Sequence, residues 1–237
     1  MNQFSLLNSL IKEFSDVSDL EILDSLSDRE RLSRDFFDYS PILAEKLQGC
    51  LADIVVKPCS LEAVLAVACA CKKFAIPLTI RGSGTGNYGQ SVPINGGVVM
   101  IMSALKKIRD FNKETGVVTV ETGCILRDLD KFLATKHRQL RLLPSTWRSA
   151  SIGGFIAGGS GGIGSVKWGF LRDPGHLQGL EVVTMQSPPK LIELDANYSE
   201  PLNHAYGTNG IITALKIATT PNIIWQEVLV DCSSLVD

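Results

Sequence analysis

The chain has 237 residues, of which 45% are hydrophobic and 20% are charged, and its formal net charge at pH 7 is −2. This length can bury one good core or two small lobes. A net charge this close to zero lacks the positive excess that is typical of nucleic-acid-binding proteins. No apolar run reaches the ~18 residues that would span a membrane. The N-terminus lacks the layout of a signal peptide, and we expect a cytoplasmic protein.

Residues 1–48 are expected to form an N-terminal helical extension, because they are amphipathic and contain no glycine before Gly49. A strand is predicted at 53–57, and Ser60 can cap the helix that follows it. A second strand is predicted at 78–80. Together these elements form a β-α-β unit, and a glycine-rich loop leaves its second strand.

Two lobes are predicted beyond this unit, with the boundary at 143/144. The first lobe, residues 49–143, is completed by three strands and a helix, at 98–102, 117–121, 140–143 and 125–138. The second lobe, residues 144–222, opens with nine glycines in 32 residues, interleaved with apolar side chains that let the segment pack. Its remaining elements are three strands and a short helix, at 180–185, 190–194, 210–217 and 200–206. Residues 223–237, with a strand at 225–230, would begin a cap domain.

The six cysteines predict reduced thiols in structural positions. None forms a Cys-x-x-Cys pair, and Cys69 and Cys71 lie two apart on a predicted helix, so they face different sides. The three histidines, His137, His176 and His204, are scattered without the spacing of metal ligands. We therefore expect neither a metal site nor a disulfide framework.

The most informative segment is the loop from Arg81 to Gln90, which directly follows the strand at 78–80. Its four glycines and small hydroxyl residues let backbone N–H groups converge on an anion, and Arg81 adds charge. Gly84, Gly86 and Gly89 have the spacing of a Rossmann fingerprint, but that motif must open a helix. Here proline and paired glycines follow, then a buried apolar run. We therefore predict a strand–loop–strand site for the diphosphate of a nucleotide cofactor.

An ordered set of short motifs resembles the FAD-binding domain of the vanillyl-alcohol oxidase/p-cresol methylhydroxylase (PCMH) superfamily, in its glycolate/D-lactate dehydrogenase-like branch. Each motif is weak alone, whereas their order is specific. The motifs lie at 55–58, 80–85, 121–123, 144–146, 151–154, 166–169, 172–173, 179–183 and 207–213. The resemblance implies an α+β fold, a two-lobed PCMH-type FAD-binding domain. A small α/β lobe and a lobe with a mixed or antiparallel sheet would hold FAD between them.

The resemblance also implies which residues contact FAD. Main-chain groups of the glycine loop would bind the pyrophosphate: Arg81, Gly82, Ser83, Gly84, Thr85, Gly86 and Asn87. A second set would line the ribityl and ring portions: Pro144, Ser145, Thr146, Ser149, Ile152, Gly153 and Gly154. A third would lie by the ribityl–isoalloxazine end: Gly161, Gly162, Ser165 and Val166. Ile211 and Ile212 would offer backbone contacts to the adenine.

The sequence departs from the family pattern in two ways, which concern how FAD is attached and where the substrate would bind. Thr85 stands where many relatives attach FAD through a histidine, and no cysteine lies between Pro144 and Gly169, so we expect noncovalent FAD. Members usually carry a C-terminal cap domain that supplies the substrate pocket and the catalytic base, and this sequence ends at Asp237, where that cap would begin. The catalytic base is therefore unknown, and His176 is not favoured for that role.

The leading functional hypothesis is an FAD-dependent oxidoreductase, or the flavin subunit or fragment of one. It would oxidise a small alcohol or 2-hydroxy acid by hydride transfer to the flavin. The alternative is a flavin-binding module that is inactive without a cap domain, a partner chain or a second copy. A third interpretation is the enolpyruvyl-glucosamine reductase branch of the same fold, which uses NADPH and has a substrate domain after its FAD motifs.

Overall fold

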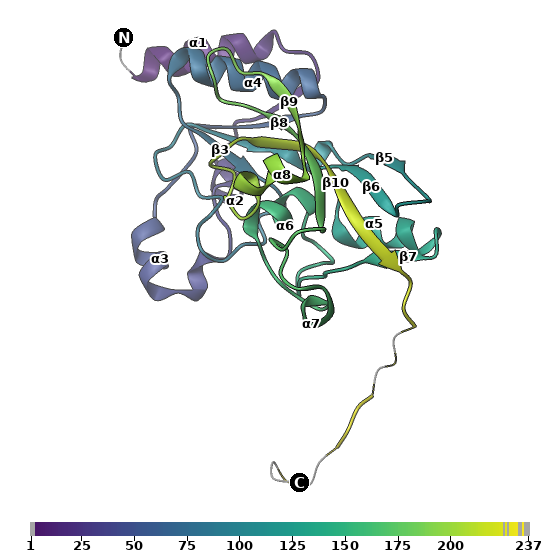
Figure 1. The fold of residues 1–237 in the computed structure, drawn as a ribbon. Helices are drawn as coiled ribbons and strands as arrows, with labels where there is room; N and C mark the ends of the chain where they lie inside the picture. Colours follow the sequence, from purple (N-terminus) through teal and green to yellow (C-terminus); the bar gives the residue numbers. More distant parts are fainter. Residues whose placement is uncertain (1–2, 225, 227, 232–233, 235–237) are drawn as a thin grey trace.

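The chain folds around two β-sheets in the computed structural model, which describes residues 3–224, 226, 228–231 and 234 (Figure 1). The first sheet has the strand order β1-β2-β4-β3. The second has the order β5-β6-β10-β8-β9, with β7 paired to β10. This arrangement confirms the predicted α+β fold with a small α/β lobe and a second, antiparallel lobe.

The first sheet contains the predicted β-α-β unit. Its parallel strands β2 (Ile54–Pro58), β3 (Leu78–Arg81) and β4 (Val98–Ile101) are joined through α4 (Leu61–Phe74) and the glycine loop. The Ser60 hydroxyl accepts the Ala63 N–H at 3.2 Å and caps α4, as predicted. Strands β2 and β4 are mostly apolar and buried, as expected of parallel strands that are covered on both faces.

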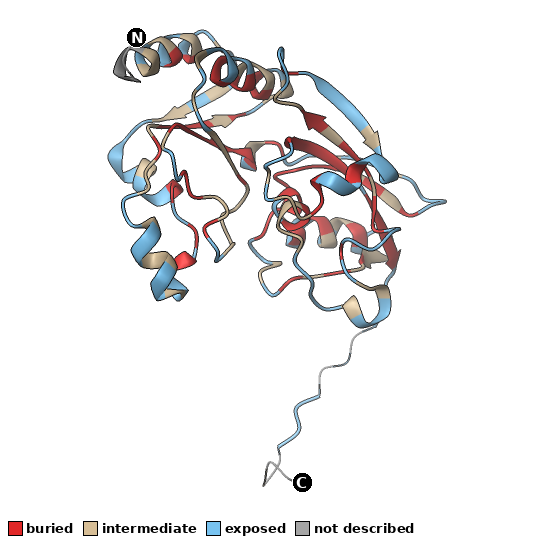
Figure 2. Cartoon of the chain, turned by 60° about the vertical axis from the view of Figure 1, so that its left-hand side comes forward, coloured by how far each residue is buried: buried red, intermediate tan, exposed pale blue. Residues whose placement is uncertain are grey.

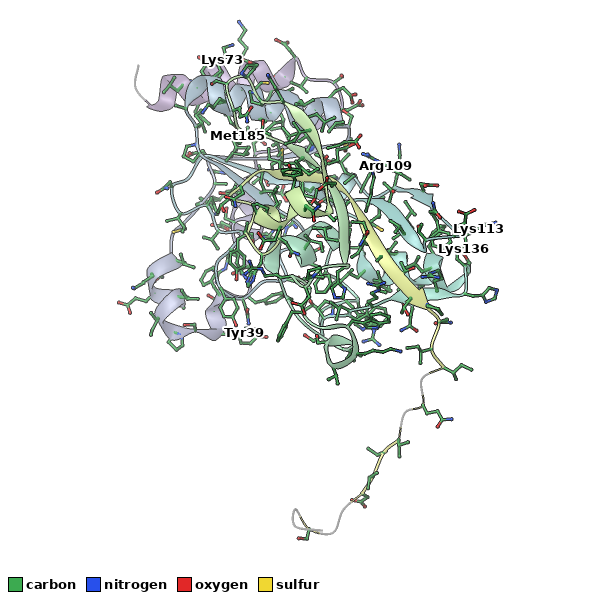
Figure 3. All side chains as sticks on the ribbon, viewed as in Figure 1. Tyr39, Lys73, Arg109, Lys113, Lys136 and Met185 are labelled. Atoms are coloured by element: carbon green, nitrogen blue, oxygen red, sulfur yellow. The ribbon has the colours of Figure 1, made fainter. Side chains whose placement is uncertain are left out.

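The N-terminal segment is not helical throughout, which corrects the prediction for residues 1–48. It consists of α1 (Gln3–Ser15), β1 (Leu20–Leu23), α2 (Leu26–Leu32), the 3₁₀ turn η1 (Phe37–Tyr39) and α3 (Pro41–Leu47). Strand β1 pairs antiparallel with β2 and forms an edge of the first sheet. Leu10 and Phe14 of α1 are buried in the core beside α4, and Glu13 pairs with Lys73 at 2.7 Å (Figure 3). The segment is therefore an integral part of this lobe.

The second sheet is built around the long strand β10 (Ile211–Pro221), which pairs antiparallel with β6 (Val117–Glu121) and β8 (Leu177–Val183). The remaining elements are η2 (Met102–Ala104), β5 (Ile108–Phe111), α5 (Leu126–Ala134), β7 (Arg138–Leu140), α6 (Ile152–Gly158), α7 (Ser165–Trp168), β9 (Leu191–Asp195), α8 (Ala196–Ser199) and η3 (Glu200–Leu202). The sheets therefore divide the chain between β4 and β5, whereas the sequence places the lobe boundary at 143/144. Pairing of β6 and β7 with the distant β10 causes the difference.

The core of the second lobe lies between this sheet and the helices α5 and α6, and its buried segments appear red in Figure 2. Arg109 of β5 ties three strands together near the cleft described below (Figure 3). Its guanidinium donates to Glu121 of β6 at 3.2 Å and to Glu181 of β8 at 3.0 Å. The Thr213 hydroxyl of β10 donates to the same Glu181 carboxylate at 2.8 Å. This network fixes the end of β6.

Three further observations concern the described part of the chain. The predicted strand at 225–230 lies partly outside the described residues, and positions 226 and 228–230 carry no strand. None of the helices there combines the length and apolar character needed to cross a bilayer. Nor do three or more His, Cys, Asp or Glu side chains gather there as a metal site would require.

The cysteines of the folded chain are expected to differ widely in reactivity. Cys59 and Cys69 are exposed, whereas burial raises the pKa of Cys71 to about 12 and that of Cys124 to about 11. Because only the thiolate reacts, iodoacetamide should label the two buried thiols about a hundredfold more slowly than the exposed pair. Peptide mapping by mass spectrometry measures this ratio. Equal labelling of Cys69 and Cys71, two residues apart on α4, would contradict the packing described here.

Candidate functional site

A cleft opens between the loop that follows β3 and the glycine-rich part of the second lobe. It contains about 960 Å³ of empty space, including the part open to solvent. The first lobe contributes Ile80, residues 82–86, Gln90 and Ser91. The second lobe contributes residues around α6, the end of β6 and the start of β10. The prediction that the glycine loop joins two strands is confirmed, because it connects β3 to the parallel strand β4.

The glycines of the loop allow close approach to the opposite wall. Gly84 has a φ of +68°, and a Cβ there would overlap the Arg81 guanidinium behind the loop. A Cβ on Gly82 would meet the Ser151 hydroxyl across the cleft. The loop therefore presents bare backbone to the cleft at the point where the two lobes come closest.

The opposite wall is the start of α6, which packs against the end of β6. The Gly153 N–H donates to the Thr122 carbonyl at 2.8 Å, and a Cβ on Gly153 would overlap the Thr122 hydroxyl. Ser151 caps this helix by accepting the Gly154 N–H at 3.4 Å. Gly153 is thus needed for the helix to pack this closely against the end of β6.

The end of α6 is closed by a strained loop. His204 and Tyr206 both have positive φ, and their amides donate to the Ile156 and Ala157 carbonyls. The His204 Nε2 and the Tyr206 hydroxyl oxygen lie 2.9 Å apart, and Tyr206 lines the cleft. Non-glycine residues in this conformation persist only where the surroundings hold them, so this loop is a fixed part of the wall.

The chemistry of the lining fits an anionic nucleotide. Among the residues that the structure describes, no Asp, Glu, His, Lys, Arg or Cys side chain lines the cleft. Its polar groups are backbone amides, the Gln90 amide, the Tyr206 phenol and several Ser and Thr hydroxyls, while Ile80, Met102, Phe155 and Ile212 give apolar surface. A diphosphate can bind such a surface through hydrogen bonds without meeting a like charge. The Tyr206 phenol is the one ionisable side chain of the described lining, so these residues are better suited to hold a cofactor than to carry out acid–base chemistry.

The structure brings half of the twenty sequence-predicted residues to the cleft surface. The lining includes Gly82, Ser83, Gly84, Thr85, Gly86, Pro144, Thr146, Gly153, Gly154 and Ile212. The other ten are outside the lining: Arg81, Asn87, Ser145, Ser149, Ile152, Gly161, Gly162, Ser165, Val166 and Ile211. Of these, Ile152 and Ile211 have side chains in the two cores, and Val166 on α7 is fully exposed.

Arg81 does not face the cleft. Its side chain is buried behind the glycine loop and donates to the Ser91 hydroxyl at 3.1 Å. Burial lowers the pKa of Arg81, and the neighbouring Asp35 carboxylate opposes that shift. His176 is also away from the lining: it is buried, with Nε2 lying 2.8 Å from the Trp168 carbonyl oxygen. This position agrees with the expectation that His176 is not the base.

Sequence reasoning missed several lining residues. Four of them lie in the motifs on which the family resemblance rests, so the sequence contained a signal for a role at the site. These are Thr122, Ser151, Gly207 and Gly210. The lining residues Met102, Phe155 and Tyr206 have no comparable local signal, since only the tertiary fold brings them to the cleft.

Comparison with known proteins gives a family and a fold. Residues 52–187 match the family model described as "FAD binding domain". The chain is 32% identical over 200 residues to a D-lactate dehydrogenase of Anaerostipes hadrus, covering 78% of this chain and 41% of that protein. It is 29% identical over 178 residues to the glycolate oxidase subunit GlcD of Bacillus subtilis (strain 168), covering 72% of this chain and 37% of that protein.

A third relative and a solved structure extend the pattern. The mitochondrial D-2-hydroxyglutarate dehydrogenase of Arabidopsis thaliana is 28% identical over 207 residues, covering 84% of this chain and 35% of that protein. A structure of alkyldihydroxyacetonephosphate synthase superimposes with a TM-score of 0.77 at 21% identity, covering 90% of this chain and 40% of that one. The chain thus spans about two fifths of the length of these proteins. By its match over more than half of its length, the chain belongs to the FAD-binding domain family.

Proposed function

We propose that the cleft between the two lobes binds FAD, with the diphosphate held by the backbone amides of residues 82–86. One observation carries this proposal: a nucleotide-sized cleft is lined by bare backbone and hydroxyl groups, with no carboxylate among the described residues. The remaining proposed contacts are those that the family resemblance implies. Residues 144–146 and 149–154 would lie along the ribityl and ring portions, and the backbone of Ile211 and Ile212 would lie at the adenine. The ribityl–isoalloxazine end would be contacted by Gly161, Gly162, Ser165 and Val166.

We propose further that FAD is bound without a covalent bond. Thr85, at the position of the attaching histidine, lines the cleft, and no histidine or cysteine does so among the described residues. Acid precipitation of the FAD-loaded chain should therefore leave yellow flavin in the supernatant. Chromatography of that supernatant should identify it as FAD. Flavin that stays with the precipitated polypeptide would overturn this proposal.

For the reaction, we propose oxidation of a small alcohol or 2-hydroxy acid. The three relatives are named for D-lactate, glycolate and D-2-hydroxyglutarate, which are all 2-hydroxy acids. When bound, FAD would accept a hydride from the substrate. The chain's own residues would bind the diphosphate, orient the cofactor through the close wall at Gly153, and give it apolar surface at Phe155 and Ile212. The catalytic base stays unassigned.

The alternative is a flavin-binding module that needs a cap domain, a partner chain or a second copy for activity. Because Tyr206 is the one ionisable side chain in the described lining, the alternative is favoured for these residues taken alone. Anaerobic mixing of the FAD-loaded chain with D-lactate, glycolate, D-2-hydroxyglutarate or NADPH separates the candidates. Bleaching by a 2-hydroxy acid supports the proposed reaction. Bleaching by NADPH alone would favour the enolpyruvyl-glucosamine reductase branch, and bleaching by none would favour the module.

The cytoplasm is the proposed compartment. The five described cysteines are all free, as expected in a reducing environment. Localisation of a tagged full-length protein by microscopy or fractionation tests this proposal.

A further inference from the structure

Residues 34–37, here called the N-terminal strap, lie against the back of the glycine loop. The Phe36 N–H donates to the Gly86 carbonyl at 2.8 Å, although fifty residues separate the two in sequence. Phe37 is almost fully buried, and Tyr39, which follows the strap, is exposed beside α3 (Figure 3). The strap thus touches a loop of the cofactor site while lying outside the matched family region.

Asp35 is the central residue of the strap. It is only 8% exposed, and Oδ1 accepts the Phe37 N–H at 3.0 Å. Oδ2 is buried and has no hydrogen-bond partner of standard geometry among the described residues. Burial raises the pKa of this carboxyl, whereas the amides of Phe37, Gly89 and Gln90 and the charge of Arg81 act in the opposite direction. The carboxyl therefore faces the glycine loop and its arginine.

Arg81 lies behind the glycine loop, and its charge acts on the Asp35 carboxyl. Its guanidinium fills the space under Gly84, where a Cβ would overlap it. It donates to the hydroxyl of Ser91, which lines the cleft. A buried guanidinium is costly without an opposite charge nearby, and the Asp35 carboxylate acts on Arg81 in that sense. Displacing the guanidinium would remove the support on which Gly84 rests.

We propose that Asp35 is a positioning residue for the diphosphate loop: buried beside the Phe36–Gly86 hydrogen bond and acting on the charge of Arg81, it holds Gly84 and Gly86 in the conformation that receives the cofactor. This inference rests on the proposed function of the cleft and adds a residue from outside the loop to it. Asp35 does not line the cleft, so it acts on the loop and not on the ligand.

The test compares Asp35→Asn with the control Asp38→Asn. Asparagine keeps an oxygen that can accept the Phe37 N–H, so Asp35→Asn mainly removes the charge opposite Arg81. Asp38 lies three residues away, is half exposed and pairs with Arg34 at the surface, so its replacement removes a charge from the same segment without facing the loop. Isothermal titration of the intact chain with FAD, ADP and adenosine gives the affinities.

The account expects Asp35→Asn to weaken FAD and ADP binding about tenfold, while adenosine binding is unchanged. Asp38→Asn should leave all three affinities as they are. A general loss of folding would lower the three affinities together, so the ratio of the ADP and adenosine affinities separates positioning from stability. Equal ADP affinity in Asp35→Asn and the parent chain would overturn the inference. Failure of the parent chain to bind FAD or ADP would instead refute the proposed function.

Hydrogen exchange of the cofactor-free chain gives a second readout that needs no ligand. In Asp35→Asn, the loop amides of residues 82–86 should exchange faster while those of α4 do not. If Asp35→Asn fails to fold, Arg81→Lys takes its place, because it keeps the charge but loses the planar fork under Gly84. It should likewise lower the ratio of ADP to adenosine affinity, and an unchanged ratio would contradict the proposed link.

Discussion

Replacing Gly84 by valine is expected to weaken FAD binding about a hundredfold or more, which corresponds to about 2.7 kcal/mol. Gly84 has a φ of +68°, and its missing side chain leaves the space that the Arg81 guanidinium fills. A β-branched residue here meets backbone strain of about 1–2 kcal/mol and must also push Arg81 aside. Because the added side chain points at Arg81 behind the loop, the variant should weaken binding by distorting the loop backbone that approaches the phosphate. Fluorescence titration with FAD measures the loss.

The matched control is Gly49→Val. Gly49 also has a positive φ, +82°, but no heavy atom lies within 4 Å of its would-be Cβ, and it is not part of the cleft lining. Gly49→Val should lose stability from backbone strain alone, and Gly84→Val should lose more because it also displaces Arg81, as measured by urea unfolding. Only Gly84→Val should lose FAD affinity. Parent-like FAD binding by Gly84→Val would show that the loop is not the diphosphate site.

The second large effect concerns turnover. The polypeptide of 237 residues should bind FAD yet oxidise substrates slowly and with little selectivity. Catalysis needs reacting groups held in contact, a proton acceptor and exclusion of water. The cleft is open to solvent, and apart from the Tyr206 phenol its described lining offers no ionisable side chain. Orientation alone is worth several orders of magnitude in rate, so its absence should lower turnover by about a thousandfold or more against an enzyme with a closed site.

Steady-state kinetics on D-lactate, glycolate, D-2-hydroxyglutarate and simple alcohols, with artificial electron acceptors and with oxygen, checks this prediction. The experiment is repeated with added cell extract to supply a partner chain. A rise in selective turnover with extract fits the module alternative. Saturable and selective turnover by the pure monomer would contradict the expectation and show that these residues build a whole active site.

Local sequence signals were sufficient where neighbouring residues determine the structure. Ser60 predicted its helix start, and the apolar runs predicted β2, β3 and β4. The glycine loop was identified as a link between two strands because proline and paired glycines exclude a helix after it. The structure adds a reason for two of the chain's glycines, because a Cβ on Gly82 or Gly153 would overlap a hydroxyl group of a neighbouring segment.

The remainder depends on contacts between distant segments. Strand β1 has only four residues and becomes a strand by pairing with β2. Helix α6 contains two glycines early in its length, which disfavour a helix, yet burial of Ile152 and Ile156 overrides this propensity. Arg81 adjoins the glycines in sequence, but its side chain turns behind the loop toward Asp35. No local sequence pattern predicts that a residue of the N-terminal strap lies behind the glycine loop.

A crystal structure of the chain grown with FAD tests the central claim most directly. The account predicts one FAD in the cleft between the two sheets, with its diphosphate oxygens within hydrogen-bond distance of the backbone amides of residues 82–86. The flavin ring should lie toward the wall formed by Pro144, Thr146 and Gly153, without a bond to Thr85. FAD bound elsewhere, or a diphosphate with no contact to this loop, would contradict the account.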